Sequence, residues 1–178
     1  EDYRGTITFL NEGAGFKHTL GLYKVDSDGK IESVEILFAN ASAEGSGGSL
    51  QRGATSVDVA LSAGDQIGFF IVPNGFGHSG GTLSKGTAYT LRDANGDPAS
   101  LTGPAPLTLY SVDPDSGTET PVKGQYGPFT FHSAADPATG YALNGDAFPH
   151  TVGHVDPETG LIVIGFEDLW RGGDKDYD

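Results

Sequence analysis

The sequence contains no cysteine and no methionine. A disulfide framework, a thiolate metal site and a cysteine nucleophile are therefore excluded. The chain also lacks an apolar run of the roughly 18 residues that a membrane-spanning helix needs, so we expect no membrane insertion. Its first residues do not resemble a signal peptide, which has a basic stretch followed by an apolar one. We expect a piece of a longer extracellular protein or a mature product, monomeric as an isolated domain.

Basic residues are also scarce. Ten Lys and Arg stand against 24 Asp and Glu, which gives a formal net charge of −14. Nucleic acids and anionic membranes are bound largely through Lys and Arg, so neither is an expected partner. The charge favours a bound cation instead. An acidic, glycine-rich chain without cysteine is typical of bacterial extracellular modules, which often use calcium where other proteins use disulfides.

Glycine and proline are abundant, at 28 and 10 residues. Inside a helix they would cost about 1 and 3 kcal/mol each, which argues strongly against a helical bundle. Short segments with alternating apolar residues predict β-strands instead. We therefore expect an all-β fold, an antiparallel β-sandwich or jelly-roll-like fold, with about nine or ten strands and long loops at one end. The predicted strands are residues 6–9, 20–25, 33–38, 57–61, 67–72, 89–91, 107–112, 129–132 and 161–166.

Two segments leave an alternative open. Residues 30–44 lack glycine and proline and also suit a helix face, although their β-branched residues favour a strand in the first half. Residues 44–53 are rich in glycine and serine and could link two domains. Because the segment after them resembles more of the same sheet, we predict a single domain, residues 1–178, cut from a larger protein.

Turns with a common composition separate several of these strands. Residues 25–29, 112–117 and 155–160 each place an Asp a few residues before a Gly. Asp closes a local turn with its side chain, and Gly supplies a positive φ, so all three predict hairpins. Residues 26–29 and 93–97 also resemble calcium loops, but turn formation is the favoured interpretation for both.

The C-terminus carries the strongest candidate site. Five carboxylates lie in the last 12 residues, with Asp174, Asp176 and Asp178 in the D-x-D-x-D spacing that opens calcium loops. Calcium binds six to eight hard oxygen ligands, and a turn at Gly172 and Gly173 could deliver them from two sides. The competing interpretation is a solvated acidic tail. The predicted metal ligands are Glu167, Asp168, Asp174, Asp176 and Asp178.

Other residues near this segment are weaker candidates. His150 and His154 have a zinc-like spacing, but no third ligand is evident. Asn144 and Asp146 precede the strand that leads into the acidic segment, so their oxygens could approach it. Trp170 could form an apolar wall of a site or plug the core.

Catalytic motifs are scarce. The sequence has no G-x-S-x-G elbow, P-loop or H-E-x-x-H motif. Residues 75–80 resemble a glycine-rich fingerprint loosely, and we interpret them as a long flexible loop with no helix after it. We therefore expect a protein that is not an enzyme.

Residues 165–177 read G-F-E-D-L-W-R-G-G-D-K-D-Y. This motif resembles the end of a calcium-associated domain of the very large, repetitive RTX-type adhesins on bacterial surfaces. Several members of that family have long been known only as a domain of unknown function. Residues 9–15, 20–26, 36–42 and 70–75 are similar to the same group, so the resemblance covers most of the chain.

The resemblance implies a calcium-dependent, non-catalytic adhesion module outside the bacterial cell. In peptide-binding relatives, the free C-terminal carboxylate of the ligand is thought to reach a protein-bound calcium ion. The expected partner is a peptide or glycan on another cell surface. A carbohydrate-binding module and a calcium-stiffened spacer of an adhesin stalk remain alternatives. By motif position the five acids carry over as calcium ligands, and the remaining ligand-binding candidates are Trp170, Gly172, Gly173, Asn144, Asp146 and His150.

Overall fold

The computed structural model describes residues 2–173, which are almost entirely β-structure. Strands hold 41% of the residues and helices 5%, which confirms the all-β prediction. The strands are β1 (Asp2–Thr8), β2 (Thr19–Val25), β3 (Ile31–Phe38), β4 (Ser56–Ser62), β5 (Gln66–Val72), β6 (Ala88–Arg92), β7 (Thr108–Val112), β8 (Glu119–Pro121), β9 (Phe131–His132), β10 (Thr151–Val155) and β11 (Ile162–Phe166).

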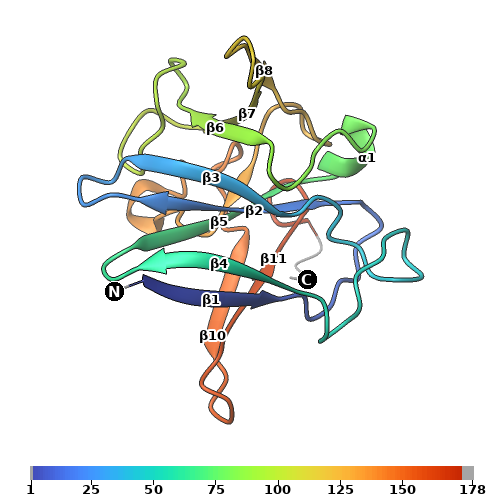
Figure 1. Ribbon diagram of the computed structural model, residues 1–178. Coiled ribbons are helices and arrows are strands. Elements are labelled where there is room, and N and C mark those ends of the chain that lie inside the picture. Colours follow the sequence, from blue (N-terminus) through green and yellow to red (C-terminus); the bar gives the residue numbers. More distant parts are fainter. Residues whose placement is uncertain (1, 174–178) are drawn as a thin grey trace.

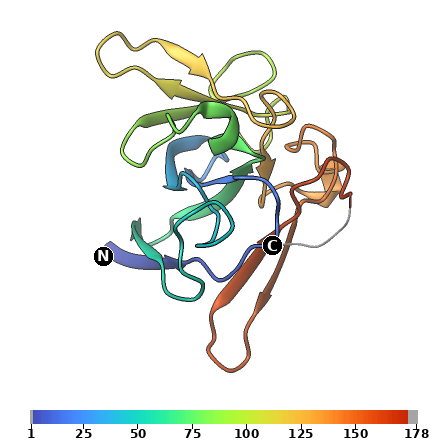
Figure 2. The same ribbon diagram turned by 90° about the vertical axis from the view of Figure 1, so that its right-hand side faces the viewer.

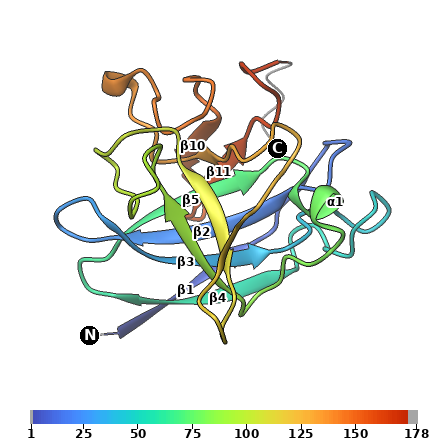
Figure 3. The same ribbon diagram turned by 90° about the horizontal axis from the view of Figure 1, so that it is seen from above.

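The strands form four antiparallel sheets. A middle sheet has the order β3-β2-β5-β9, with the β6-β7-β8 sheet on one side and the β1-β4 pair on the other (Figure 1). The β6-β7-β8 sheet crosses the middle sheet at a steep angle in the view from above (Figure 3). The β10-β11 hairpin projects away from these layers (Figure 2). The arrangement is consistent with the predicted β-sandwich.

The middle sheet has a packed core against each of its faces. Successive side chains along a strand point to opposite faces, so each strand contributes to both cores. On β2, Tyr23 packs into the core shared with β6-β7-β8, whereas Leu22 packs into the core shared with β1-β4. On β5, Phe70 joins the first core and Ile71 joins a third cluster with Phe131 and Phe166. The continuous apolar run of β5 therefore follows from burial on both sides.

Two glycines of the middle sheet lie beneath aromatic rings. Tyr23 on β2 is paired with Gly68 on β5, and Gly21 is paired with Phe70. A Cβ at Gly68 would lie 2.4 Å from the Tyr23 ring, and one at Gly21 would lie 2.2 Å from the Phe70 ring. These positions need glycine because the rings occupy the space of a side chain.

The three Asp-Gly turns form hairpins, as predicted. They join β2 to β3, β7 to β8 and β10 to β11. In each turn the Oδ1 atom of the Asp accepts two backbone N–H groups, at Asp26, Asp113 and Asp156. Asp93 likewise accepts from the N–H groups of Asn95 and Asp97. These contacts confirm the turn interpretation at residues 26–29 and 93–97.

Other parts of the prediction need refinement. Residues 31–38 form β3, so the first half of the ambiguous segment is a strand. The sequence did not predict β8 or β10 as strands. The segment interpreted as a flexible loop contains the short helix α1 (Gly75–Ser79), and Pro137–Thr139 form one 3₁₀ turn. No helix within residues 2–173 has the length and hydropathy needed to span a bilayer.

Candidate functional site

The base of the β10-β11 hairpin is held by a buried ion pair. The Nε2 atom of His150 lies 3.0 Å from Oδ2 of Asp146, and neither side chain is exposed to solvent. Asp146 also accepts the backbone N–H groups of Phe148, at 3.1 Å, and Arg171, at 2.5 Å. Its carboxylate thus joins the loop before β10 to the segment after β11. Asp146 thus supports the structure of this segment, and its role as a ligand-binding candidate stays a prediction.

His150 connects the same ion pair to Glu167. Its Nδ1 atom lies 2.8 Å from the Glu167 carbonyl oxygen, and the Glu167 N–H donates to the His150 carbonyl at 2.9 Å. Both ring nitrogens therefore face oxygen atoms. The exposed His154 is on β10 beyond this contact, and nothing joins the two histidines into one site.

Asn144 has a comparable structural role. Its Oδ1 atom accepts the N–H of His132 on β9 at 2.7 Å, and its Nδ2 atom donates to the Phe148 carbonyl at 2.5 Å. The residue is buried. Asn144 therefore connects the loop before β10 to the middle sheet, and its amide is already engaged at both ends.

Glu167 and Asp168 follow β11 directly, as the sequence predicted, and both are buried, at 0% and 8% exposure. The Oε1 atom of Glu167 accepts the Leu169 N–H at 2.9 Å, whereas Oε2 has no partner within the described chain. A buried carboxylate oxygen without a partner is costly, because water no longer solvates it. This oxygen is the clearest sign of a group that the protein alone does not satisfy.

Asp168 is paired with a residue that the sequence did not indicate. Its Oδ2 atom lies 3.0 Å from Nε2 of His18, which precedes β2. The Nδ1 atom of His18 accepts the N–H of Asn74 at 3.1 Å, so a neutral ring has its proton on Nε2. Although Asp168 lies 3.0 Å from Nε2, the geometry is not that of a hydrogen bond, and Nε2 has no hydrogen-bond partner within the described chain. No local signal marks His18, because its partner is far away in the sequence.

The donor atoms at this position fit a hard cation. Carboxylate oxygens are the ligands that calcium prefers, and Glu167 offers one unengaged oxygen. Residues 2–173 contain no group of three or more His, Cys, Asp or Glu arranged around a metal position. Asp174, Asp176 and Asp178 lie outside the described residues. Of the five predicted ligands, Glu167 and Asp168 lie within the described residues, and their role as ligands stays a prediction.

An aromatic cluster surrounds the turn after Asp168. The Trp170 ring lies 5.4 Å from Tyr126, 5.5 Å from Phe129 and 6.3 Å from Phe131, measured between centroids. Trp170 thus packs against the core while remaining partly exposed. Gly172 has a φ of 63°, which favours glycine, and a Cβ at Gly173 would lie 2.8 Å from Leu169.

Tyr126 lies within reach of the buried carboxylates of this site. Burial raises the pKa of the Tyr126 hydroxyl, and the negative charges of Asp168, Glu167 and Asp146 raise it further. A hydrogen bond with the Trp170 backbone acts in the opposite direction. The negative charges of three carboxylates thus act on the Tyr126 hydroxyl.

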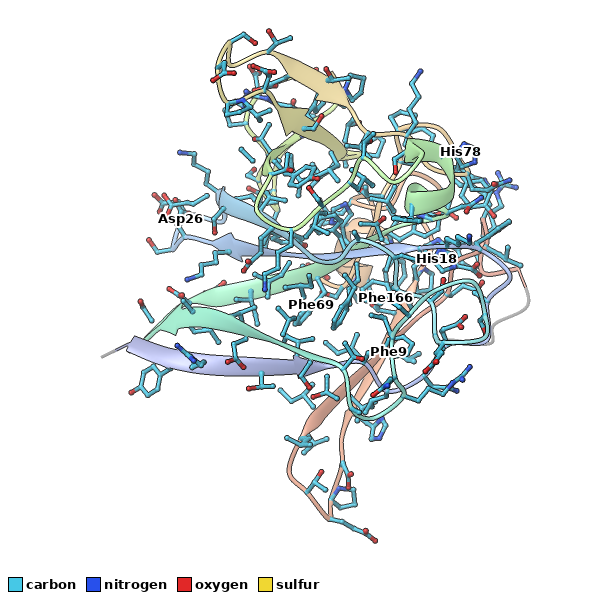
Figure 4. All side chains as sticks on the ribbon, turned by 45° about the vertical axis from the view of Figure 1, so that its right-hand side comes forward. Phe9, His18, Asp26, Phe69, His78 and Phe166 are labelled. Carbon is cyan, nitrogen blue, oxygen red and sulfur yellow. The ribbon has the colours of Figure 1, made fainter. Side chains whose placement is uncertain are left out.

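A cavity of about 480 Å³ opens beside Asp168. Phe9, Phe69 and Phe166 line it, with Glu12, His18 and Asp168 among the polar residues of its wall. Figure 4 shows Phe9, Phe69 and Phe166 converging between the β1-β4 pair and the middle sheet, with His18 nearby and Asp26 and His78 away from them. We call this cavity the groove.

A family model described as a domain of unknown function, DUF4114, matches residues 61–178. The match covers more than half of the chain and includes the β10-β11 hairpin, the ion pair and the acidic segment. The chain belongs to the DUF4114 family. No curated protein and no solved structure shows significant similarity to it. In this DUF4114 domain, β5 and β9 of the middle sheet lie within the matched region, whereas Phe9, Glu12 and His18 of the groove precede it.

Proposed function

We propose that this DUF4114 domain is a calcium-dependent, non-catalytic adhesion module of a bacterial cell surface that binds the C-terminal carboxylate of a peptide on a target cell. The observation that supports this proposal best is the unpartnered Oε2 atom of the buried Glu167 beside Asp168. The acidic segment and its resemblance to adhesin domains support it as well.

Glu167 and Asp168 would hold the ion together with Asp174, Asp176 and Asp178. A bound calcium ion supplies a positive charge on a surface that otherwise repels anions. His18 lies 3.0 Å from the side chain of Asp168, and the Leu169 N–H donates to Oε1 of Glu167. The ion pair of Asp146 and His150 fixes the start and end of the hairpin on which these acids stand.

Calorimetric titration tests the proposal. An array of peptides with free C-termini supplies the probes, and each selected peptide is compared with its amidated form, with calcium and with excess chelator. We expect binding only for the free acid and only with calcium. Binding that persists in chelator, or that is equal after amidation, would refute the mechanism.

Variants locate the ion in the same experiment. Asp174→Ala and Asp176→Ala should abolish peptide binding with little change in the far-UV circular dichroism spectrum. Asp115→Ala, in the exposed β7-β8 turn, is the matched control and should bind like the wild type. If only sugars with vicinal hydroxyl groups bind, the result supports the calcium site but refutes the peptide as the ligand, which is then a carbohydrate.

A further inference from the structure

The groove lies beside two strands whose outer edges have no partner strand in the described chain. β1 pairs with β4 alone, and β11 pairs with β10 alone. Residues 6–9 and 162–166 line the groove, whereas no residue of β4 or β10 does. The groove is therefore bordered by the free sides of β1 and β11. Such edges can accept an additional strand through their backbone groups.

The hydrogen-bond pattern shows which backbone groups of β11 point outward. The Asp156 N–H donates to the Leu161 carbonyl, and the Glu167 N–H donates to the His150 carbonyl. The backbone groups of the odd-numbered residues of β11 therefore face β10. In an antiparallel pair, successive residues direct their backbone groups alternately towards and away from the partner strand. The N–H and C=O groups of Ile162, Ile164 and Phe166 therefore face away from β10. These three residues form the unpaired edge that lines the groove.

Apolar side chains line the rest of the groove and continue beyond it. Leu20, Phe69 and Ile71 of the middle sheet contribute to its wall. On the projecting hairpin, Leu161 and Ile162 are 65% and 74% exposed. Exposed apolar side chains beside an apolar groove on a strongly acidic protein are typical of a contact site for a partner. An extended peptide with apolar residues at alternate positions would cover it, because alternate side chains of a strand share one face.

The acidic side of the groove gives the bound peptide a direction. Glu12 and Asp168 lie in its wall, and Asp168 is a candidate calcium ligand. A peptide carboxylate can approach Asp168 only if a cation lies between them. With the proposed calcium ion at Asp168, the C-terminus would lie there, and the preceding residues would extend along β11 towards Ile162.

We propose that the groove binds an extended peptide that adds as a strand to the free edge of β11, parallel to it, with alternate apolar side chains directed into the groove. This inference rests on the proposed function, since the calcium site holds the C-terminus of the same peptide. It adds the recognition of the residues before that C-terminus, through backbone hydrogen bonds and apolar contacts.

The first test measures amide hydrogen exchange by NMR on the wild-type domain with calcium. The probes are free-acid peptides from an array in two arms, one alternating apolar with polar residues and one with the same composition in apolar blocks. We expect the alternating arm to bind and to slow exchange at Ile164 and Phe166, while Thr151 and Gly153 on the far edge of β10 are unchanged. No binding in either arm, or binding without this protection, overturns the proposal.

The second test blocks the edge chemically. Ile164→Pro removes an N–H that β10 does not use, and proline is tolerated at such positions of edge strands. We expect it to weaken binding of the alternating peptide at least about tenfold. Val155→Pro makes the same change on the opposite edge of the hairpin and should alter affinity by less than about twofold. Equal effects of the two variants overturn the proposal. If Ile164→Pro does not fold, the exchange measurement decides.

The outcomes separate this inference from the function on which it rests. Calcium-dependent binding of a free-acid peptide without protection of β11 overturns the added strand and leaves the calcium site intact. Protection of Ile164 by a peptide that binds equally in chelator supports the added strand and refutes the calcium mechanism. Protection that appears without peptide as protein concentration rises identifies a second copy of the chain as the occupant, which overturns the proposal.

Discussion

The imidazole ring of His150 lies flat against the ring of Phe131, with their centroids 3.5 Å apart and their planes inclined by 6°. Phe131 is on β9, at the edge of the middle sheet, whereas His150 begins the β10-β11 hairpin. The stacked pair therefore joins the projecting hairpin to the core. Asp146 contacts the Nε2 atom at the edge of the same imidazole. The orientation of the hairpin therefore depends on the side chains of Phe131, His150 and Asp146.

Removing Asp146 should be strongly destabilising. Asp146→Ala leaves the buried His150 without its ion-pair partner and the Arg171 N–H without an acceptor. Removing one partner leaves the other polar group buried without a partner. We therefore expect a loss of about 3 kcal/mol in the free energy of unfolding, measured by urea titration. Asp156→Ala, which removes only contacts within an exposed turn, should cost clearly less. Equal losses would show that the buried ion pair has no special role.

Calcium should raise the melting temperature through Glu167. At a thousandfold excess over its dissociation constant, a ligand of the folded state adds about 4 kcal/mol. Glu167→Gln keeps an acceptor for Leu169 but loses the charge, so most of this gain should disappear. The variant should be at least as stable as the wild type in chelator, since a neutral amide costs less to bury than a carboxylate with an unpartnered oxygen.

Glu158→Gln is the matched control for this measurement, because Glu158 lies exposed in the β10-β11 turn. Its calcium-induced shift should equal that of the wild type. An unchanged calcium response in Glu167→Gln would remove Glu167 from the set of ligands.

His132 should make the domain sensitive to mild acid. Burial lowers the pKa of His132 from 6.5 to about 3, because the ring is fully enclosed and its Nδ1 atom has no partner in the described chain. Below about pH 6.5, His132 takes up a proton in the unfolded chain but stays neutral in the folded chain. Stability is therefore complete above this pH and falls as the pH is lowered towards 3. At pH 5 the loss should be about 2 kcal/mol.

Urea titrations between pH 7 and pH 5 in chelator would measure this loss. His132→Phe keeps a ring beside Tyr23 and Phe70 and cannot be protonated, so its stability should change much less over the same range. Carboxyl groups with lowered pKa values, such as Asp113 and Asp156, act at lower pH. An identical pH dependence in the variant would contradict the assignment to His132.

Gly68 should not tolerate a side chain. The Cβ of Gly68→Ala would lie 2.4 Å from the Tyr23 ring, which is fully buried and cannot move freely. We expect a loss of about 1–3 kcal/mol in the free energy of unfolding, as for other overpacked cores. Gly153→Ala in β10 is the control, because the nearest atom to its Cβ would be 3.4 Å away. A difference of less than about 0.5 kcal/mol between the two would count against the steric argument.

The sequence predicted best the strands that alternate regularly. β4 and β5 were predicted almost to their ends, because one alternates and the other is continuously apolar. β10 was missed because Gly153 and His154 interrupt its pattern and most of the strand is exposed. The helix α1 was missed because two glycines lie within its five residues, which lowers helix propensity.

The candidate site was only partly predictable. Glu167 and Asp168 were placed correctly at the end of a strand, since that strand has a clear apolar pattern. The sequence could not show that Asp146 and His150 bind each other, because a loop fixes their directions. Nor could it indicate His18, whose contact with Asp168 depends on how the middle sheet brings β2 beside the C-terminal segment.

The middle sheet draws its strands from both sides of the family boundary at residue 61. β3 and β2 come from residues 1–60, β5 and β9 come from residues 61–178, and the pairing of β2 with β5 joins the two halves into one sheet. A segment beginning at residue 61 would start inside β4 and leave β5 without its neighbour β2. A gene rearrangement that moved the matched region alone would transfer half a sheet. Exchange of this domain between proteins must therefore carry residues 1–60 with it.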